Sequence, residues 1–282
     1  MHPDVLEIEN FYRRAALGRF ATRQLTRRVA ETWDDLQGMT VVGFGYTPPV
    51  CKPVIKRCAR LISLMPERQG ALAWPVDGPV TTVLTHESEW PLTTGMADRI
   101  VMMHGLETSQ NAASVLDECW RVLAPEGRAL IIVPNRAGIW ARRDLTPFGS
   151  GRPFTASQLT RLLGNRRFGV IAIRAALFAP PSEHKFWIRM AQLLERTGSR
   201  YAFRFAGGVL LAEVNKRVFQ PHRPPLAETV ASKLKALEGM AAPGTRPVSN
   251  RDHNGFGREY CKLWGNSGGY SGFRGVDLQN MS

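Results

Sequence analysis

Cysteine is scarce and unpatterned in this 282-residue chain. The four cysteines, Cys51, Cys58, Cys119 and Cys261, show no Cys-x-x-Cys spacing, which argues against a zinc site and against a disulfide framework. Reduced thiols suit a cytoplasmic protein, and we expect that localisation. No uninterrupted apolar run approaches ~18 residues, so no membrane span is expected. The first residues, Met-His-Pro-Asp, lack the basic and apolar regions of a secretory signal.

Several motifs that carry well-defined chemistry are missing as well. The sequence has no phosphate loop with a lysine, no His-Glu-x-x-His pair and no Gly-x-Ser-x-Gly elbow between an expected strand and an expected helix. The full glycine fingerprint of a dinucleotide-binding oxidoreductase is absent, and so is the acid that follows it. These absences disfavour nucleotide hydrolysis, serine hydrolysis, zinc proteolysis and hydride transfer.

Positive charge is abundant. The formal net charge is +13 and the isoelectric point is near 10.3, which favours acidic partners such as nucleic acid, an anionic membrane surface or an anionic small molecule. The excess is spread along the chain, so a solvated basic face is the plainer interpretation. Apolar residues make up 44% of the chain, enough for a substantial core.

One stretch predicts a βαβ unit. The apolar run Ile100–Met103 suits a strand buried on both faces of a parallel sheet. Residues 108–122 place apolar side chains at helical spacing, with Ser109 as the expected N-cap. Pro125 and Gly127 predict a tight turn into a second apolar strand, residues 129–133. Such units gather ligands at the carboxyl ends of their strands.

The same stretch resembles a known family. The segment Arg121-Val-Leu-Ala-Pro-Glu-Gly-Arg128, with the apolar strand and Pro134-Asn135 after it, is similar to class I S-adenosylmethionine-dependent methyltransferases. The small bacterial type 11 group is the subgroup it most resembles, and the resemblance extends from about residue 39 to about residue 214. It implies a Rossmann-like α/β fold with a seven-stranded, mostly parallel sheet, helices on both faces and an N-terminal helical segment. It also implies methyl transfer with S-adenosylmethionine as cofactor.

The resemblance assigns residues to the cofactor. Two glycines end the first strand, and glycine lets a backbone turn tightly and approach a ligand closely. The implied cofactor-binding residues are Gly43, Phe44, Gly45, Tyr46, Met65, Glu67, His86 and Glu87. Three positions depart from the family pattern: Val41 and Met65 stand where acids are usual, and Thr47 stands where a third glycine is usual. Either His86 or Glu87 takes the place of the acid that contacts adenine.

Residues beyond the fourth and fifth strands are candidates for the acceptor. His104 is the predicted base or acceptor-positioning group, the alternative being a strand-end histidine bonded to its own loop. The predicted substrate contacts are Asn135, Trp140, Arg142 and Arg143, since arginine beside tryptophan can hold an anionic or aromatic molecule. Solvated arginines are the alternative.

The remaining elements follow from periodicity and caps. Residues 4–33 predict two helices broken near Gly18, which either cover the substrate side of the sheet or pack on an outer face. A capping box at Thr155 predicts a helix ended by Gly164. Other expected helices are 50–59 and 183–197, and other expected strands are 40–43, 60–64, 80–85, 168–178 and 205–214.

The sequence predicts residues 1–218 as the catalytic domain and 219–282 as a C-terminal helix, 226–240, followed by a disordered basic tail. Our leading hypothesis is methyl transfer to a small-molecule acceptor, with oxygen, nitrogen, carbon and sulfur all open as the accepting atom. The altered residues Val41 and Met65 motivate a second hypothesis, a degenerate methyltransferase fold that serves as a binding or scaffold protein. Charge and the tail motivate a third, an RNA-binding or RNA-modifying protein.

Overall fold

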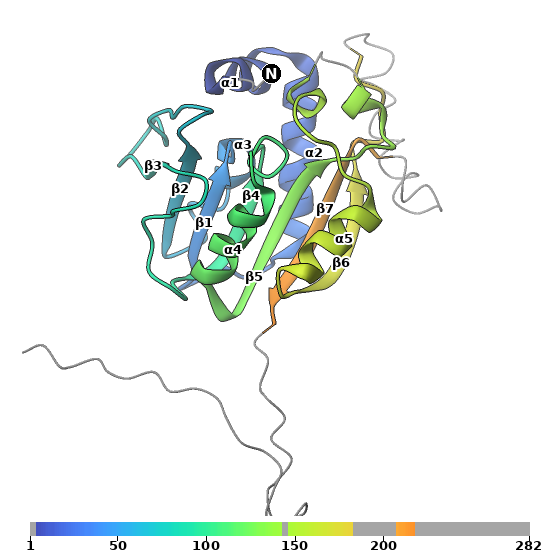
Figure 1. Cartoon of the computed structure of the whole chain (residues 1–282). Coiled ribbons are helices and arrows are strands. Elements are labelled where there is room, and N and C mark those ends of the chain that lie inside the picture. Colours follow the sequence, from blue (N-terminus) through green and yellow to red (C-terminus); the bar gives the residue numbers. More distant parts are fainter. Residues whose placement is uncertain (1–3, 143–145, 183–206, 218–282) are drawn as a thin grey trace, which may run out of the picture. The chain divides into compact units, whose positions relative to one another are not determined.

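A mixed sheet forms the centre of the molecule (Figure 1). The computed structural model describes residues 4–142, 146–182 and 207–217. The strand order is β3-β2-β1-β4-β5-β7-β6, in which β1 to β5 run parallel and β7 runs antiparallel to both of its neighbours. This confirms the predicted fold class. The strands are β1 Thr40–Gly45, β2 Arg60–Pro66, β3 Thr82–Thr85, β4 Ala97–Met103, β5 Leu123–Pro134, β6 Phe168–Ala176 and β7 Val209–Lys216.

Helices cover both faces of this sheet (Figure 1). The long helix α2 lies on one face, α4 and α5 lie on the other, and α1 lies beyond the carboxyl ends of the parallel strands. No helix among the described residues is long and apolar enough to span a bilayer. The helices are α1 Val5–Arg14, α2 Ala16–Thr32, α3 Pro48–Cys51, α4 Ala112–Val122 and α5 Ala156–Asn165, with the 3-10 turns η1 Ile139–Arg142 and η2 Pro147–Gly149.

The central strands are apolar at consecutive positions because both faces of the sheet are buried. Val41 and Val101 pack toward α1 and α2, whereas their neighbours Val42 and Ile100 pack toward α4. All four side chains are fully buried. Side chains alternate between the two faces of a strand, so each unbroken apolar run supplies both cores at once.

The break between the two N-terminal helices lies at Ala15, so the expectation of a break near Gly18 was wrong. Gly18 lies inside α2, where a Cβ atom would overlap the carbonyl group of Phe11 and the Cα of Tyr12. The glycine is therefore used for the close crossing of α1 and α2. The two helices are placed differently: α2 packs on a face of the sheet, and α1 covers the ends of the strands.

The expected helix at residues 50–59 is only the four-residue α3 followed by turns. Pro53 has no amide hydrogen to donate to the helical ladder, and this ends α3 early. The amide of Val54 instead bonds to the carbonyl of Cys51, three residues back, at 2.9 Å.

Helix α4 also starts later than expected. Ser109 is not its N-cap, since its hydroxyl donates to the carbonyl of Leu106 at 2.8 Å. Asn111 is the cap, and its Oδ1 accepts from the amides of Ala113 and Ser114. The expected turn at residues 125–127 lies within the bounds of β5, where the register with β4 shifts between Ala97 and Arg99.

The capping box at Thr155 is confirmed, and the antiparallel pairing of β6 with β7 agrees with the two late strands expected. Gly164 does not end α5, which continues to Asn165; the left-handed residue that follows is Arg167, with φ of 63°. The expected helices 183–197 and 226–240, the start of the strand at residue 205 and the tail lie outside the described residues.

Candidate active site at the carboxyl ends of the strands

The glycine loop after β1 is held against the end of β4. Gly45 has a φ of 84°, a left-handed conformation that glycine adopts without strain. A Cβ atom on Gly45 would overlap the carbonyl of Met103 and the backbone of Gly105, and one on Gly43 would overlap the side chain of Thr47. The loop therefore lies directly beside His104, which stands between Met103 and Gly105.

His104 follows β4 and is fully buried in a left-handed conformation, with φ of 55°. Backbone strain of this kind costs about 1–3 kcal/mol and collects at functional sites. Gln69 Nε2 and Thr108 Oγ1 both donate to the His104 carbonyl at 3.0 Å and hold this conformation. The ring Nε2 lies 2.7 Å from the Tyr12 hydroxyl, in hydrogen-bond contact. The ring of His104 thus bonds to α1, whereas its own loop bonds to its backbone carbonyl through Thr108.

Glu107 is the second ionisable group of this cluster. Its side chain has no solvent exposure, and its Oε1 lies 3.2 Å from His104 Nδ1. The direction of that contact is not that of a hydrogen bond, and among the described residues neither Glu107 carboxylate oxygen has a hydrogen-bond partner. Gln69 Oε1 is buried without a partner in the same part of the structure. Buried polar atoms are nearly always paired, so this group of bare oxygens is unusual.

Aromatic rings enclose the cluster. Tyr12 stacks on Tyr46 with ring centroids 5.7 Å apart, and Phe148 lies 4.6 Å from the His104 ring. Trp140 meets Phe148 edge-on at 5.9 Å. Burial raises the pKa of Tyr12 well above its usual value, and Glu107 raises it further, so the phenol stays protonated. We define Tyr12, His104 and Glu107 as the buried triad.

The ends of β2 and β3 bring two predicted cofactor residues together. His86 Nε2 lies 3.8 Å from Glu67 Oε1, and both side chains are more than half exposed, at 56% and 52%. Met65, by contrast, is fully buried in the core under α1 and α2. Of Met65 and Glu67, Glu67 is thus the one that presents a carboxylate at the surface.

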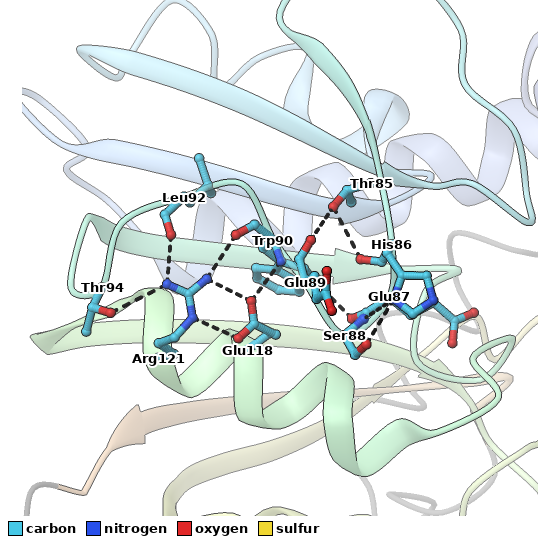
Figure 2. A network of polar contacts seen from close by, with 10 residues as sticks. All are labelled: Thr85, His86, Glu87, Ser88, Glu89, Trp90, Leu92, Thr94, Glu118 and Arg121. Atoms are coloured by element: carbon cyan, nitrogen blue, oxygen red, sulfur yellow. Dashed lines mark hydrogen bonds and ion pairs between the residues drawn. The ribbon is translucent and has the colours of Figure 1, made fainter. Parts of the chain in front are cut away.

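The segment from residue 85 to residue 94 is anchored to α4 by a polar network (Figure 2). Glu118 Oε2 accepts from the amide of Trp90 at 2.7 Å, and Arg121 donates to the carbonyls of Leu92 and Trp90. The hydrogen bonds between the two side chains lower the pKa of Glu118 and raise the pKa of Arg121. This network fixes Trp90, whose ring stacks on Phe44 at 4.6 Å.

Glu87 and His86 differ in exposure. Glu87 is largely buried, and its Oε2 accepts from the amide of Gln110 at 3.0 Å. The His86 ring is exposed and contacts Ser88 through Nδ1 at 2.9 Å. Glu87 therefore ties this segment to the loop before α4, and His86 is the member of the pair that faces solvent.

The residues predicted to hold substrate are spread over different environments. Asn135 Nδ2 donates to the carbonyl of Gly207 at 2.7 Å, and Trp140 Nε1 donates to the carbonyl of Ala179 at 2.7 Å. Both side chains are buried and join the end of β5 to the β6–β7 region. Arg142 is exposed, and Arg143 lies outside the described residues.

A family model described as a methyltransferase domain matches residues 42–131, from β1 into β5. A protein of Mycolicibacterium smegmatis, described as a probable S-adenosylmethionine-dependent methyltransferase, is 36% identical over 85 residues. That match spans 29% of this chain and 33% of the relative. Residues 42–131, less than half of this chain, thus match a methyltransferase domain.

Solved structures share the methyltransferase fold at low identity. One is a Thermotoga maritima S-adenosylmethionine-dependent methyltransferase described as a possible histamine N-methyltransferase, with TM-score 0.54 and 17% identity over 76% of this chain and 96% of that one. Another is a [4+2]-cyclase, with TM-score 0.51 and 16% identity over 75% of this chain and 86% of that one. Identities this low establish the fold alone.

Sequence reasoning found His104 but missed its two partners. Tyr12 is 92 positions away, within the first of the two helices expected over residues 4–33. Glu107 stands three residues after His104, but that spacing outside a helix says nothing about proximity. The one available signal was the acid itself, a carboxylate in an otherwise uncharged stretch directly after a buried strand.

Proposed function

We propose that the protein transfers the methyl group of S-adenosylmethionine to a small-molecule acceptor beside His104. The observation that carries the proposal is the methyltransferase match over residues 42–131, which contains both the glycine loop and the strand that ends at His104. The contact of Gly45 with the backbone on either side of His104 supports a reaction centre at this point. A strained, buried histidine between a phenol and a carboxylate supports it further.

The residues present fit the cofactor in three respects. Gly45 gives the tight turn that lets the backbone come close to a ligand. The exposed carboxylate of Glu67, at the end of β2, can accept hydrogen bonds from ribose hydroxyls in place of the usual acid at Met65. The buried stack of Phe44 on Trp90, which Arg121 and Glu118 hold in place, anchors the segment that carries His86.

Methyl transfer of this kind is a direct displacement that needs no covalent intermediate with the protein. The bound cofactor supplies an electrophilic methyl group on a sulfonium, and the displacement is accelerated mainly by holding the acceptor in line and excluding water. Tyr12 and Phe148 cover His104 and exclude solvent from it. His104 would take the acceptor's proton, and Tyr12 would orient the ring through Nε2.

Calorimetric titration of the full chain with S-adenosylhomocysteine tests the proposal. We expect micromolar binding, weakened about tenfold by Glu67→Gln, because a charge-assisted hydrogen bond contributes about 1.5–3 kcal/mol. The matched control is Glu7→Gln, an exposed acid of α1, which should bind as the wild type does. Substitution of Gly45 would be a poor test, since any side chain there enters the backbone of the β4 end.

Two altered positions in the cofactor motifs support a second candidate function, in which the protein is a catalytically inactive scaffold with the methyltransferase fold. Thr47, in the place of the third glycine, fills the space next to Gly43, and Met65 is buried in the core. The [4+2]-cyclase shares the fold, so the fold alone does not imply methyl transfer. Absence of S-adenosylhomocysteine binding at millimolar ligand, with the protein shown to be folded by circular dichroism, would favour the scaffold and reject the enzyme.

A further inference from the structure

Within the part of the chain that the structure describes, three buried side-chain oxygens, in Glu107 of the buried triad and in Gln69, lack hydrogen-bond donors. Both carboxylate oxygens of Glu107 and the side-chain oxygen of Gln69 are buried, and among the described residues none of the three accepts a hydrogen bond. His104 Nδ1 is also buried without a partner. Each bare buried oxygen costs about 1–3 kcal/mol. A ligand that carries several N–H or O–H groups would satisfy them together.

The negative charge of the Glu107 carboxylate favours a positively charged ligand. A buried carboxylate is stable only when it is paired, and within 4 Å of Glu107 the described residues offer His104 and neither lysine nor arginine. The rings of Tyr12 and Phe148 lie 5.8 Å and 4.6 Å from the His104 ring, and aromatic rings favour a cation over a neutral group because a ring face carries partial negative charge. A primary ammonium meets both needs, since it supplies one positive charge and three N–H donors.

We propose that the methyl acceptor is an amine, which binds as its ammonium ion to Glu107 beside His104. The inference rests on the proposed methyl transfer and adds the class of acceptor. It also gives Glu107 a role: the carboxylate binds the amine, and the neighbouring histidine removes its proton.

The proton balance of the reaction is complete with the groups present and the methyl donor. The step requires the tautomer in which His104 Nε2 carries the proton and donates it to the Tyr12 hydroxyl, which leaves an Nδ1 lone pair next to Glu107. The ammonium gives one proton to Nδ1, and the amine lone pair then bonds to the methyl carbon while the carbon–sulfur bond breaks and its electrons stay on sulfur. The products are a methylated ammonium and a neutral thioether, and His104 releases its proton to solvent.

Phenethylamine and 2-phenylethanol form a matched pair of probes, equal in size but different in charge. Methylamine and spermidine, beside methanol, extend the test to acceptors of other sizes. We expect at least one amine to bind the protein saturated with S-adenosylhomocysteine at least tenfold more tightly than its matched alcohol. Methyl-labelled S-adenosylmethionine should then label that amine.

Three variants identify the binding group. Glu107→Gln should weaken amine binding at least tenfold and leave the dissociation constant of S-adenosylhomocysteine within twofold. Glu213→Gln removes another mostly buried carboxylate, paired with Arg128 on the sheet, and should change neither affinity. His104→Asn should retain amine binding but lose transfer, with the residual rate increasing as pH rises and free amine accumulates.

The results that would contradict the inference differ from those that would contradict the proposed function. If Glu107→Gln weakens S-adenosylhomocysteine and spares the amine, the carboxylate binds the cofactor's own ammonium and the inference is wrong. Failure of every amine to bind the cofactor-saturated protein, or equal binding of amine and alcohol, would also reject it. Failure of S-adenosylhomocysteine itself to bind would reject the proposed function, and the two failures are therefore distinguishable.

Discussion

At the crossing of α1 over α2, we expect Gly18→Ala to destabilise the protein, although alanine has the higher helix propensity. Gly18 lies in the first turn of α2, and a Cβ atom there would overlap backbone atoms of Phe11 and Tyr12. Backbone atoms cannot rotate away as a side chain can, so α1 must move as a whole. Its start is bonded to the carbonyl of Gln69 at 2.8 Å, and Tyr12 is bonded to His104.

Gly18→Ala therefore combines two opposing effects. Alanine gains about 1 kcal/mol over glycine in a helix interior. Overpacking against a rigid neighbour costs about 1–3 kcal/mol, and the loss of the Tyr12 hydrogen bond adds about 1 kcal/mol. We expect a net loss of about 1–3 kcal/mol, which lowers the melting temperature by roughly 2–12 °C for a domain of this size.

Gly164 is the matched control, a helical glycine in α5 with open space where its Cβ would stand. Gly164→Ala should raise stability by about 0.5–1 kcal/mol. Thermal unfolding of both full-length variants, followed by far-ultraviolet circular dichroism, should show a lower melting temperature for Gly18→Ala and a higher one for Gly164→Ala. A Gly18→Ala protein stabilised as much as Gly164→Ala would show that α1 does not pack against α2 as described.

Three further predictions concern the cap, the polar network and the thiols. Asn111→Ala should lower the unfolding free energy by about 1 kcal/mol in urea titration through loss of the α4 cap; an unchanged midpoint would contradict the cap. Glu118 has a lowered pKa when folded, so its contribution is present above the unfolded value of about 4.3 and is lost as pH falls through the folded value. The stability difference between wild type and Arg121→Met should thus shrink on acidification, and a constant difference would argue against the ion pair. Burial raises the pKa of Cys51 and of Cys119 to about 12, so iodoacetamide at neutral pH should label neither until the protein is unfolded, as mass spectrometry of the peptides would show.

The sequence predicted the strands well because their signal is local. Ile100–Met103 and residues 129–133 are buried on both faces, and an unbroken apolar run reports that directly. The Thr155 capping box was equally local and was found. Helix boundaries failed where two local signals competed: Ser109 and Asn111 both suit an N-cap, and only the geometry of the preceding turn selects Asn111.

The candidate site was predicted in part because its members come from distant segments. His104 could be found from its position after a strand, whereas Tyr12 reaches it only through the packing of α1 over the strand ends. Gly18 shows the same limit, since its role depends on a helix crossing that periodicity cannot specify. Long-range geometry, and not residue type, was the missing information.

The placement of α2 sets the shortest part of this protein that could be produced on its own. The family match ends inside β5 and begins after α2, so a fragment of residues 42–131 would lack the helix that covers one face of its sheet. Val101, Met103 and Leu130 would then face water, and β5 would lose its pairing with β7. Exposed apolar surface and an open strand edge promote aggregation. A shortened protein for crystallisation or isotope labelling should therefore begin before α1 and continue beyond β7.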